Sequence, residues 1–228
     1  MISLPISPSG PVKRRVSAFT ILELLTVIGI MALVSVASMP AVSALTKSSK
    51  INQAMSQITS TLEQARQYAV ANNTYTWVAF YQDSTAQEGS EVYVATLGSR
   101  DGTDPTDGFT TGGNVDMSRV IPLNRNASFA QVQLKQPGAN SWPALPSVTA
   151  SQLAGNVTFR INIPGKGETS FDQVIQFTPA GEARVSPGLP SVIELGLRPE
   201  LGGNVADANN IAVIRVAGMT GQTRLFRP

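Results

Sequence analysis

Three aspartates in one short segment are the residues most suggestive of metal chemistry. Asp101, Asp104 and Asp107 stand near glycines in the stretch SRDGTDPTDGF. Oxygen-rich loops of this kind bind calcium in some proteins, but the spacing does not match the alternating ligand positions of an EF-hand. Aspartate and glycine also form turns in their own right. We therefore expect a hydrated turn, with the three aspartates only as weak metal candidates.

The composition excludes the commonest catalytic chemistries. The chain of 228 residues contains no histidine and no cysteine. Without histidine it lacks the usual general base near neutral pH and the commonest zinc ligand, and without cysteine it forms neither a disulfide nor a thiolate site. Carboxylates such as Glu182 and Glu194 show no pattern that would suggest acid and base roles. We expect a protein that is not an enzyme and that uses no cofactor.

The net charge gives little support for nucleic-acid binding. The formal charge is +2, but Lys13, Arg14 and Arg15 stand together near the start, and removing their three charges leaves −1. A nucleic-acid interface needs basic residues clustered on the folded part, whereas the remaining ones are scattered among carboxylates. Nucleic acid is not expected as a partner.

A single glutamate, Glu23, stands at the front of a long apolar run. From Leu24 to Leu45 no residue carries a charge, and a helix of that length measures about 33 Å, enough for a bilayer core of about 30 Å. The basic residues before the run favour a cytoplasmic N-terminus. The sequence thus predicts a single membrane span, with the rest of the chain outside the cytoplasm.

The position of Glu23 suggests an assembly device. A carboxylate inside a membrane-crossing helix is costly, so such a residue usually has a partner. A cut just before Phe19 would create an ammonium group one helical turn away, on the same chain or on a neighbouring one. Pairing between chains would hold one subunit against the next.

The stretch KRRVSAFTILELLTVIGIMALVSVASMPAVSAL resembles the class III signal of type IV pilins and type II secretion pseudopilins. The resemblance implies cleavage between Ala18 and Phe19 by the prepilin peptidase, N-methylation of Phe19, and docking of Glu23 onto the adjacent subunit. Ala18 replaces the glycine that the family usually has before the cut. Pro40 matches the proline of many pilins and should kink the helix, whereas Ala32 replaces a common helix-loosening glycine.

Beyond Pro40 the sequence predicts a helix followed only by strands. Apolar residues recur every three or four positions from Ile51 to Ala69, and the segment ANN at 71–73 predicts the stop, so that the helix would run from Phe19 to Asn72. Eight later runs are β-branched or alternating and predict strands at 74–81, 91–97, 128–134, 157–163, 174–178, 191–197, 211–217 and 223–226. This order predicts an α+β class without βαβ alternation.

The resemblance adds a fold and a division of the chain. It implies a pilin-like fold, in which a long N-terminal helix with a membrane-spanning inner half and an amphipathic outer half packs on an antiparallel sheet. The stretches LEQARQYAVANNTYTWVAFY, VIQFTPAGEARV and MTGQTRLF are similar to H-type minor pseudopilins and FimT-like minor pilins. The expected parts are a cleaved leader (1–18), a transmembrane and assembly helix (19–46), its amphipathic continuation (47–73) and a β-rich domain (74–228) with a variable region near 98–156.

The function expected from this resemblance is that of a minor pilin or pseudopilin. Its partners would be the prepilin peptidase, other pilin subunits, an inner-membrane assembly platform and, before assembly, the lipid bilayer. It would be a single-pass protein of the inner membrane with a periplasmic C-terminal domain. Two alternatives stay open: an exported soluble β-rich binding protein cut by ordinary signal peptidase near Ala44, and an uncleaved membrane-tethered enzyme or receptor.

Overall fold

The computed structural model describes residues 20–85, 89–135, 148–153, 155–201, 204–205 and 211–227, with the backbone alone at 37–48, 201 and 204–205. The chain divides into two compact units, Met1–Ala44 and Leu45–Pro228. The described part of the first unit is the beginning of helix α1 (Ile21–Ala71). The second unit contains the end of α1 and all of the described strands.

Helix α1 begins and ends where nearby groups satisfy its free backbone atoms. At the start, the Thr20 hydroxyl accepts a hydrogen bond from the Glu23 N–H at 3.2 Å, as an N-cap does. At the end, Asn73 has a φ of 49° and the Thr74 N–H donates to the Ala69 carbonyl at 3.0 Å. This is a Schellman motif with asparagine in the left-handed position, which asparagine tolerates better than most residues. It explains why the helix stops at the predicted ANN segment.

The part of α1 that lies in the second unit buries one face. Its buried side chains are three or four residues apart, so they form a stripe along the helix. Each large apolar side chain in such a stripe stabilises the fold by about 1.5–3 kcal/mol relative to exposure. The buried residues of this stripe are Ile51, Ala54, Met55, Ile58, Leu62, Ala65 and Ala69.

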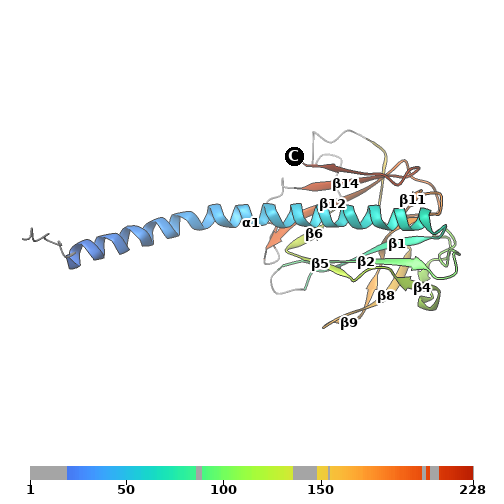
Figure 1. The fold of residues 1–228 in the computed structure, drawn as a ribbon, viewed down its shortest axis with the longest axis horizontal. Coiled ribbons are helices and arrows are strands. Elements are labelled where there is room, and N and C mark those ends of the chain that lie inside the picture. Colours follow the sequence, from blue (N-terminus) through green and yellow to red (C-terminus); the bar gives the residue numbers. More distant parts are fainter. Residues whose placement is uncertain are drawn as a thin grey trace, which may run out of the picture. The chain divides into compact units, whose positions relative to one another are not determined.

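The first sheet is covered on both of its faces. Val78 and Phe80 lie in the core that contains the stripe of α1, whereas Trp77 and Ala79 lie in a second core on the other face. Because both faces are buried, TYTWVAFY is a nearly continuous apolar run rather than an alternating one. The six strands have the order β11-β10-β1-β2-β4, with β5 also paired to β2. Figure 1 shows the end of α1 running across the strands of the second unit. Their bounds are β1 (Thr76–Asp83), β2 (Glu91–Ser99), β4 (Val120–Pro122), β5 (Ala127–Ala130), β10 (Gln173–Phe177) and β11 (Ala183–Arg184).

Two further sheets complete the two cores. The second sheet has six strands in the order β13-β12-β14-β15, with β6 and β7 also paired to β12, and it shares the core of α1. The third sheet, β3-β8-β9, closes the opposite core. The second sheet consists of β6 (Val132–Leu134), β7 (Ala150–Gln152), β12 (Val192–Leu201), β13 (Asn204–Val205), β14 (Ala212–Ala217) and β15 (Thr223–Phe226). The third consists of β3 (Gly113–Asn114), β8 (Val157–Ile163) and β9 (Gly167–Phe171), and a 3₁₀ turn, η1 (Met117–Arg119), precedes β4.

The structure corrects the expected fold class and localisation. More residues lie in strands than in helix, so the chain is mainly β and the expected α+β pilin-like class is wrong, although one long helix, α1, precedes the strands. Among the residues that the structure describes, no helix is long and apolar enough to cross a membrane. The expectations of a membrane-spanning inner half and of a single-pass inner-membrane protein are therefore wrong for the described part.

Candidate functional site

The clearest unusual surface of the described chain is the apolar part of α1 between residues 21 and 36, which we call the exposed apolar helix. Its large apolar side chains are exposed by 45% at the least and 85% at the most. They lie at successive positions as well as at helical spacing, so no polar face is left. A helix that is apolar all round normally lies buried. The residues are Ile21, Leu22, Leu24, Leu25, Val27, Ile28, Ile30, Met31, Leu33, Val34 and Val36.

Glu23 is the acidic residue of this segment, and the structure gives its backbone a local role. Its N–H is the one that Thr20 caps, and its carbonyl accepts from the Thr26 hydroxyl at 2.9 Å. An acidic side chain in a first helical turn also interacts favourably with the helix dipole. The pattern Thr-x-x-Glu at 20–23 is typical of a capping box, and this signal in the sequence was missed. Among the described residues, the Glu23 carboxylate has no hydrogen-bond or ion-pair partner.

The other residues of the proposed processing site cannot be placed in the same way. Ala18 and Phe19 lie outside the described residues. The helix runs through Pro40 without a break in its assignment, but the side chain of Pro40 is outside the described part. Cleavage before Phe19, methylation of Phe19 and a kink at Pro40 therefore stay predictions.

The three aspartates do not converge on a common point but are held by their own loop. Asp101 accepts from the Thr103 N–H at 3.0 Å and from the Thr103 hydroxyl at 2.6 Å, which holds its pKa at about 2. Asp104 bonds Thr106 in the same way, at 2.8 and 2.6 Å. Its second oxygen accepts from the Gly108 N–H and from the Gln176 amide, both at 2.8 Å, and Asp107 accepts from the Thr110 hydroxyl at 2.8 Å. In the described part of the chain, no group of three or more acidic, histidine or cysteine residues could hold a metal.

An ion-pair cluster fixes the hairpin of β8 and β9 to the first sheet. Lys166, in the turn between these strands, donates to Asp83 of β1, and its ammonium lies 4.0 Å from Glu91 of β2. It also lies 4.9 Å from the centre of the Tyr93 ring, in a cation–π contact. The Lys166 bond and the Thr85 hydroxyl lower the pKa of Asp83 to about 2. Because its members come from distant positions, this cluster had no signal in the sequence.

This cluster predicts a stability loss in acid. The folded pKa of Asp83 is about 2, below an unfolded value of about 3.9. Its contribution is therefore full above pH ~4 and disappears as the pH falls toward ~2; it amounts to at most about 2 kcal/mol. Urea unfolding at a series of pH values should show this loss. In Asp83→Asn the free energy of unfolding should change less between pH ~4 and pH ~2 than in the wild type. An equal change in both proteins would contradict the stabilising role given to the Asp83 carboxylate.

The C-terminal hairpin is held against α1 by side chains of the helix. The Glu63 carboxylate accepts from the Thr223 N–H at 3.1 Å and from its hydroxyl at 2.6 Å, and the Arg66 guanidinium donates to the Thr220 carbonyl at 2.6 Å. A charged acceptor in such bonds makes them stronger than neutral ones. The end of α1 is thereby joined to β14 and β15 by polar bonds as well as by the core.

Two glutamates considered for acid–base roles serve in ion pairs. Glu194 of β12 pairs with Arg215 of β14 at 2.6 Å, with both side chains almost completely buried. Glu182 pairs with Arg184 at 2.7 Å. Each glutamate thus has an arginine as its partner, which is a structural arrangement and not the paired carboxylates of an acid–base site.

Comparison with protein-family models, curated proteins and solved structures finds no match for this chain. The family assignment therefore stays a prediction, carried by the leader and helix motifs.

Proposed function

We propose that the chain is a structural subunit of a filament of the type IV pilus or type II secretion kind, and that it assembles through the exposed apolar helix. The observation that carries the proposal is the large apolar surface of residues 21–36, in which Glu23 is the one charged residue. Contiguous exposed apolar surface of this kind marks an interaction site. Packing such helices side by side in a bundle of subunits would remove it from water. Prepilin peptidase and other subunits are the partners that this proposal requires.

In this proposal the Glu23 carboxylate pairs with the N-terminal ammonium of a neighbouring subunit. The absence of a partner for this carboxylate among the described residues supports such a role. Glu23→Gln keeps the backbone N–H that bonds to the Thr20 hydroxyl but removes the charge, so it separates the helix cap from the pairing. We expect this variant to fold normally while incorporation into filaments falls by roughly tenfold or more, since charge-paired hydrogen bonds at interfaces cost about 2 kcal/mol or more when broken. Incorporation measured by pelleting and immunoblotting at wild-type level would remove the pairing from the proposal.

A second candidate is an exported β-rich binding protein whose apolar segment is a signal peptide cut near Ala44. One observation favours it: the compact second unit begins at Leu45, next to the small residues that signal peptidase prefers.

The start of the mature chain separates the two candidates. Intact-mass and N-terminal peptide analysis of the protein from its native host should give a chain that begins at Phe19 with an added methyl group. A chain that begins near Leu45 would lack the exposed apolar helix altogether, so that result would establish the second candidate and end the first.

A further inference from the structure

Strand β8 has an open edge over half of its length. It is the middle strand of the third sheet, and β9 pairs with it from Phe159 to Ile163. On the other side, β3 pairs with β8 only at Val157 and Thr158. Among the described residues, no strand continues β3 alongside the remainder of β8. An open edge of this kind is a template for pairing with another chain.

The backbone groups on this edge belong to Arg160 and Asn162. The carbonyls of Asn156 and Thr158 accept from the N–H groups of β3 and the residue after it, at 3.0 and 2.9 Å. Backbone groups alternate in direction along a strand, so Arg160 and Asn162 direct their N–H and C=O groups to the same side as Thr158. These groups therefore lie on the edge that β3 pairs with, beyond the point where β3 ends.

A groove with a volume of about 660 Å³ runs along this edge. Its second wall is the connection between β4 and β5, at Asn124, Arg125 and Asn126, and it includes apolar side chains of Leu97 and Ile161. The volume lies within the range of ligand-binding clefts. Apolar surface beside free backbone groups is the combination on which strand-addition sites rely.

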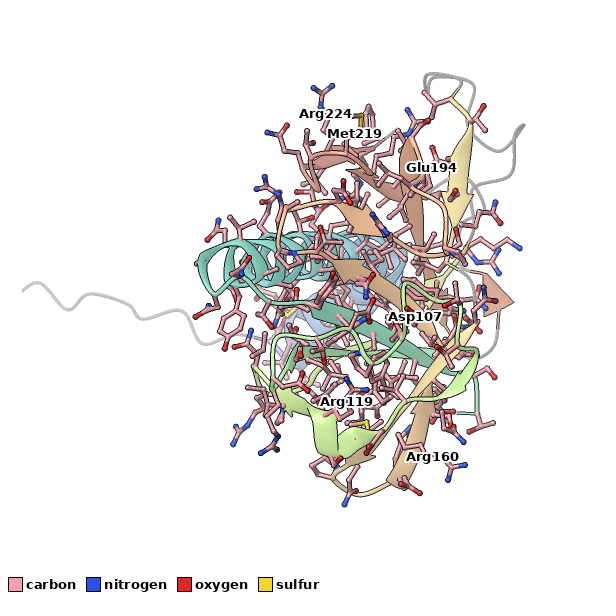
Figure 2. All side chains as sticks on the ribbon, turned by 90° about the vertical axis from the view of Figure 1, so that its right-hand side faces the viewer. Asp107, Arg119, Arg160, Glu194, Met219 and Arg224 are labelled. Carbon is pink, nitrogen blue, oxygen red and sulfur yellow. The ribbon has the colours of Figure 1, made fainter. Side chains whose placement is uncertain are left out.

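The groove carries positive charge and no negative charge. Arg125 and Arg160 line it, and none of its lining residues is aspartate or glutamate. Arg125 has no side-chain partner among the described residues. Arg160 lies on the outside of the molecule (Figure 2), where its guanidinium is 3.5 Å from Glu168 with both side chains more than half exposed. Its Nε also donates to the Asn114 side-chain oxygen, at a long 3.4 Å. Such exposed contacts contribute little, so Arg160 can exchange them for a ligand carboxylate.

We propose that this groove binds an extended acidic segment of a partner protein, which adds as a strand to the open edge of β8 between Arg160 and the β4–β5 connection. The backbone of Arg160 and Asn162 supplies the strand bonds, and the two guanidinium groups select carboxylates. A second copy of this chain fits less well, because pairing β8 with its own equivalent would place arginines close together. The proposal does not depend on the filament function and applies equally to the second candidate.

The probe is a panel of fluorescein-labelled eight-residue peptides in which glutamate alternates with valine or threonine, with lysine-for-glutamate peptides as controls. The full chain should bind at least one acidic member, by fluorescence anisotropy, ~10-fold or more tightly than its lysine counterpart. Arg125→Glu should weaken that binding by about tenfold or more. Arg224→Glu, the same charge change at an exposed residue outside the groove, should leave it unchanged.

A second pair of variants tests the backbone bonds. Asn162→Pro removes an N–H on the open edge without removing a bond to β9, whereas Asn162→Ala removes only the side chain. We expect binding to be lost with proline and kept with alanine, with both variants melting like the wild type. If the proline variant is destabilised, hydrogen exchange of segment 157–163 in the wild type tests the backbone bonds instead. Strand addition must slow exchange in this segment when the peptide is bound.

Three results would overturn the proposal. The first is that no acidic member of the panel binds better than its lysine counterpart. The second is that binding survives Arg125→Glu or occurs without slower exchange at 157–163. The third is slower exchange at 157–163 that appears on concentrating the chain alone, which would identify a second copy as the occupant.

Discussion

Leu25→Glu is expected to abolish assembly of the chain while leaving its β-rich unit folded. Leu25 is 63% exposed in the single chain, so the new carboxylate meets water and costs little before assembly. Once neighbouring subunits cover the helix, the same carboxylate becomes a buried charge without a partner, at a cost of about 3–5 kcal/mol. Association should weaken by about a hundredfold or more.

The control for this variant lies on the same helix. Gln67 is exposed on the part of α1 that belongs to the second unit, and Gln67→Glu adds the same charge outside the exposed apolar helix. Sedimentation velocity of the detergent-free chain should show assemblies for the wild type and for Gln67→Glu but not for Leu25→Glu. Equal assembly of both variants would mean that residues 21–36 are not the interface.

Gly218→Ala is expected to cause the largest loss of stability among single alanine substitutions of the glycines that the structure describes. An added Cβ at this position would lie 1.7 Å from the carbonyl oxygen of Pro190, which is a backbone atom and has no side-chain freedom to move away. Gly218, which directly follows β14, also makes two backbone bonds: its N–H donates to the carbonyl of Ser191, just before β12, at 3.1 Å, and its carbonyl accepts from the N–H of Ala183 in β11 at 2.7 Å. The backbone can relieve the clash only by breaking these bonds, so we expect a loss of about 3 kcal/mol or more.

Thermal and urea unfolding measure this loss. In a unit of this size, 3 kcal/mol corresponds to a fall in Tm of roughly 6–12 °C. Gly188→Ala is the matched control, because an added Cβ there meets no atom within 4 Å and its φ is not positive. A melting temperature for Gly218→Ala equal to that of Gly188→Ala would show that Gly218 does not lie against the Pro190 carbonyl as described.

Two strands have the bounds that the sequence predicts. The runs at 157–163 and 223–226 match β8 and β15 residue for residue, and the predicted stop of the helix has its physical cause in the left-handed conformation of Asn73. In these places the period of apolar residues or one special backbone conformation decides the local structure.

Short strands escaped prediction because pairing, and not local pattern, creates them. β4 and β7 contain three residues each, and each becomes a strand only through its bonds to β2 or β12. The predicted run at 128–134 divides into β5 and β6, which pair with different sheets. Between them, Gln131 takes a φ of 62°, a conformation that nothing in its residue type suggests.

The candidate sites also differ in whether they depend on local sequence or on long-range contacts. The apolar run behind Glu23 is visible in the sequence, because it depends on residues that are neighbours along the chain. The groove beside β8 depends on where β3 ends and on which loop lies opposite, so Arg125 and Arg160 come together only in the folded chain. The same holds for the ion pair of Lys166 and Asp83, which are 83 positions apart.

Disulfide cross-linking tests most directly whether the exposed apolar helix joins subunits. The chain has no cysteine, so Ile28→Cys in this helix and Gln67→Cys outside it each provide a single thiol. A disulfide forms readily only where two Cα atoms approach within about 7 Å. Under mild oxidation of the assembled protein in its native host, we predict a linked dimer for Ile28→Cys and none for Gln67→Cys. A mature chain without residue 28, or linking at Ile28→Cys no faster than at Gln67→Cys, would contradict the account.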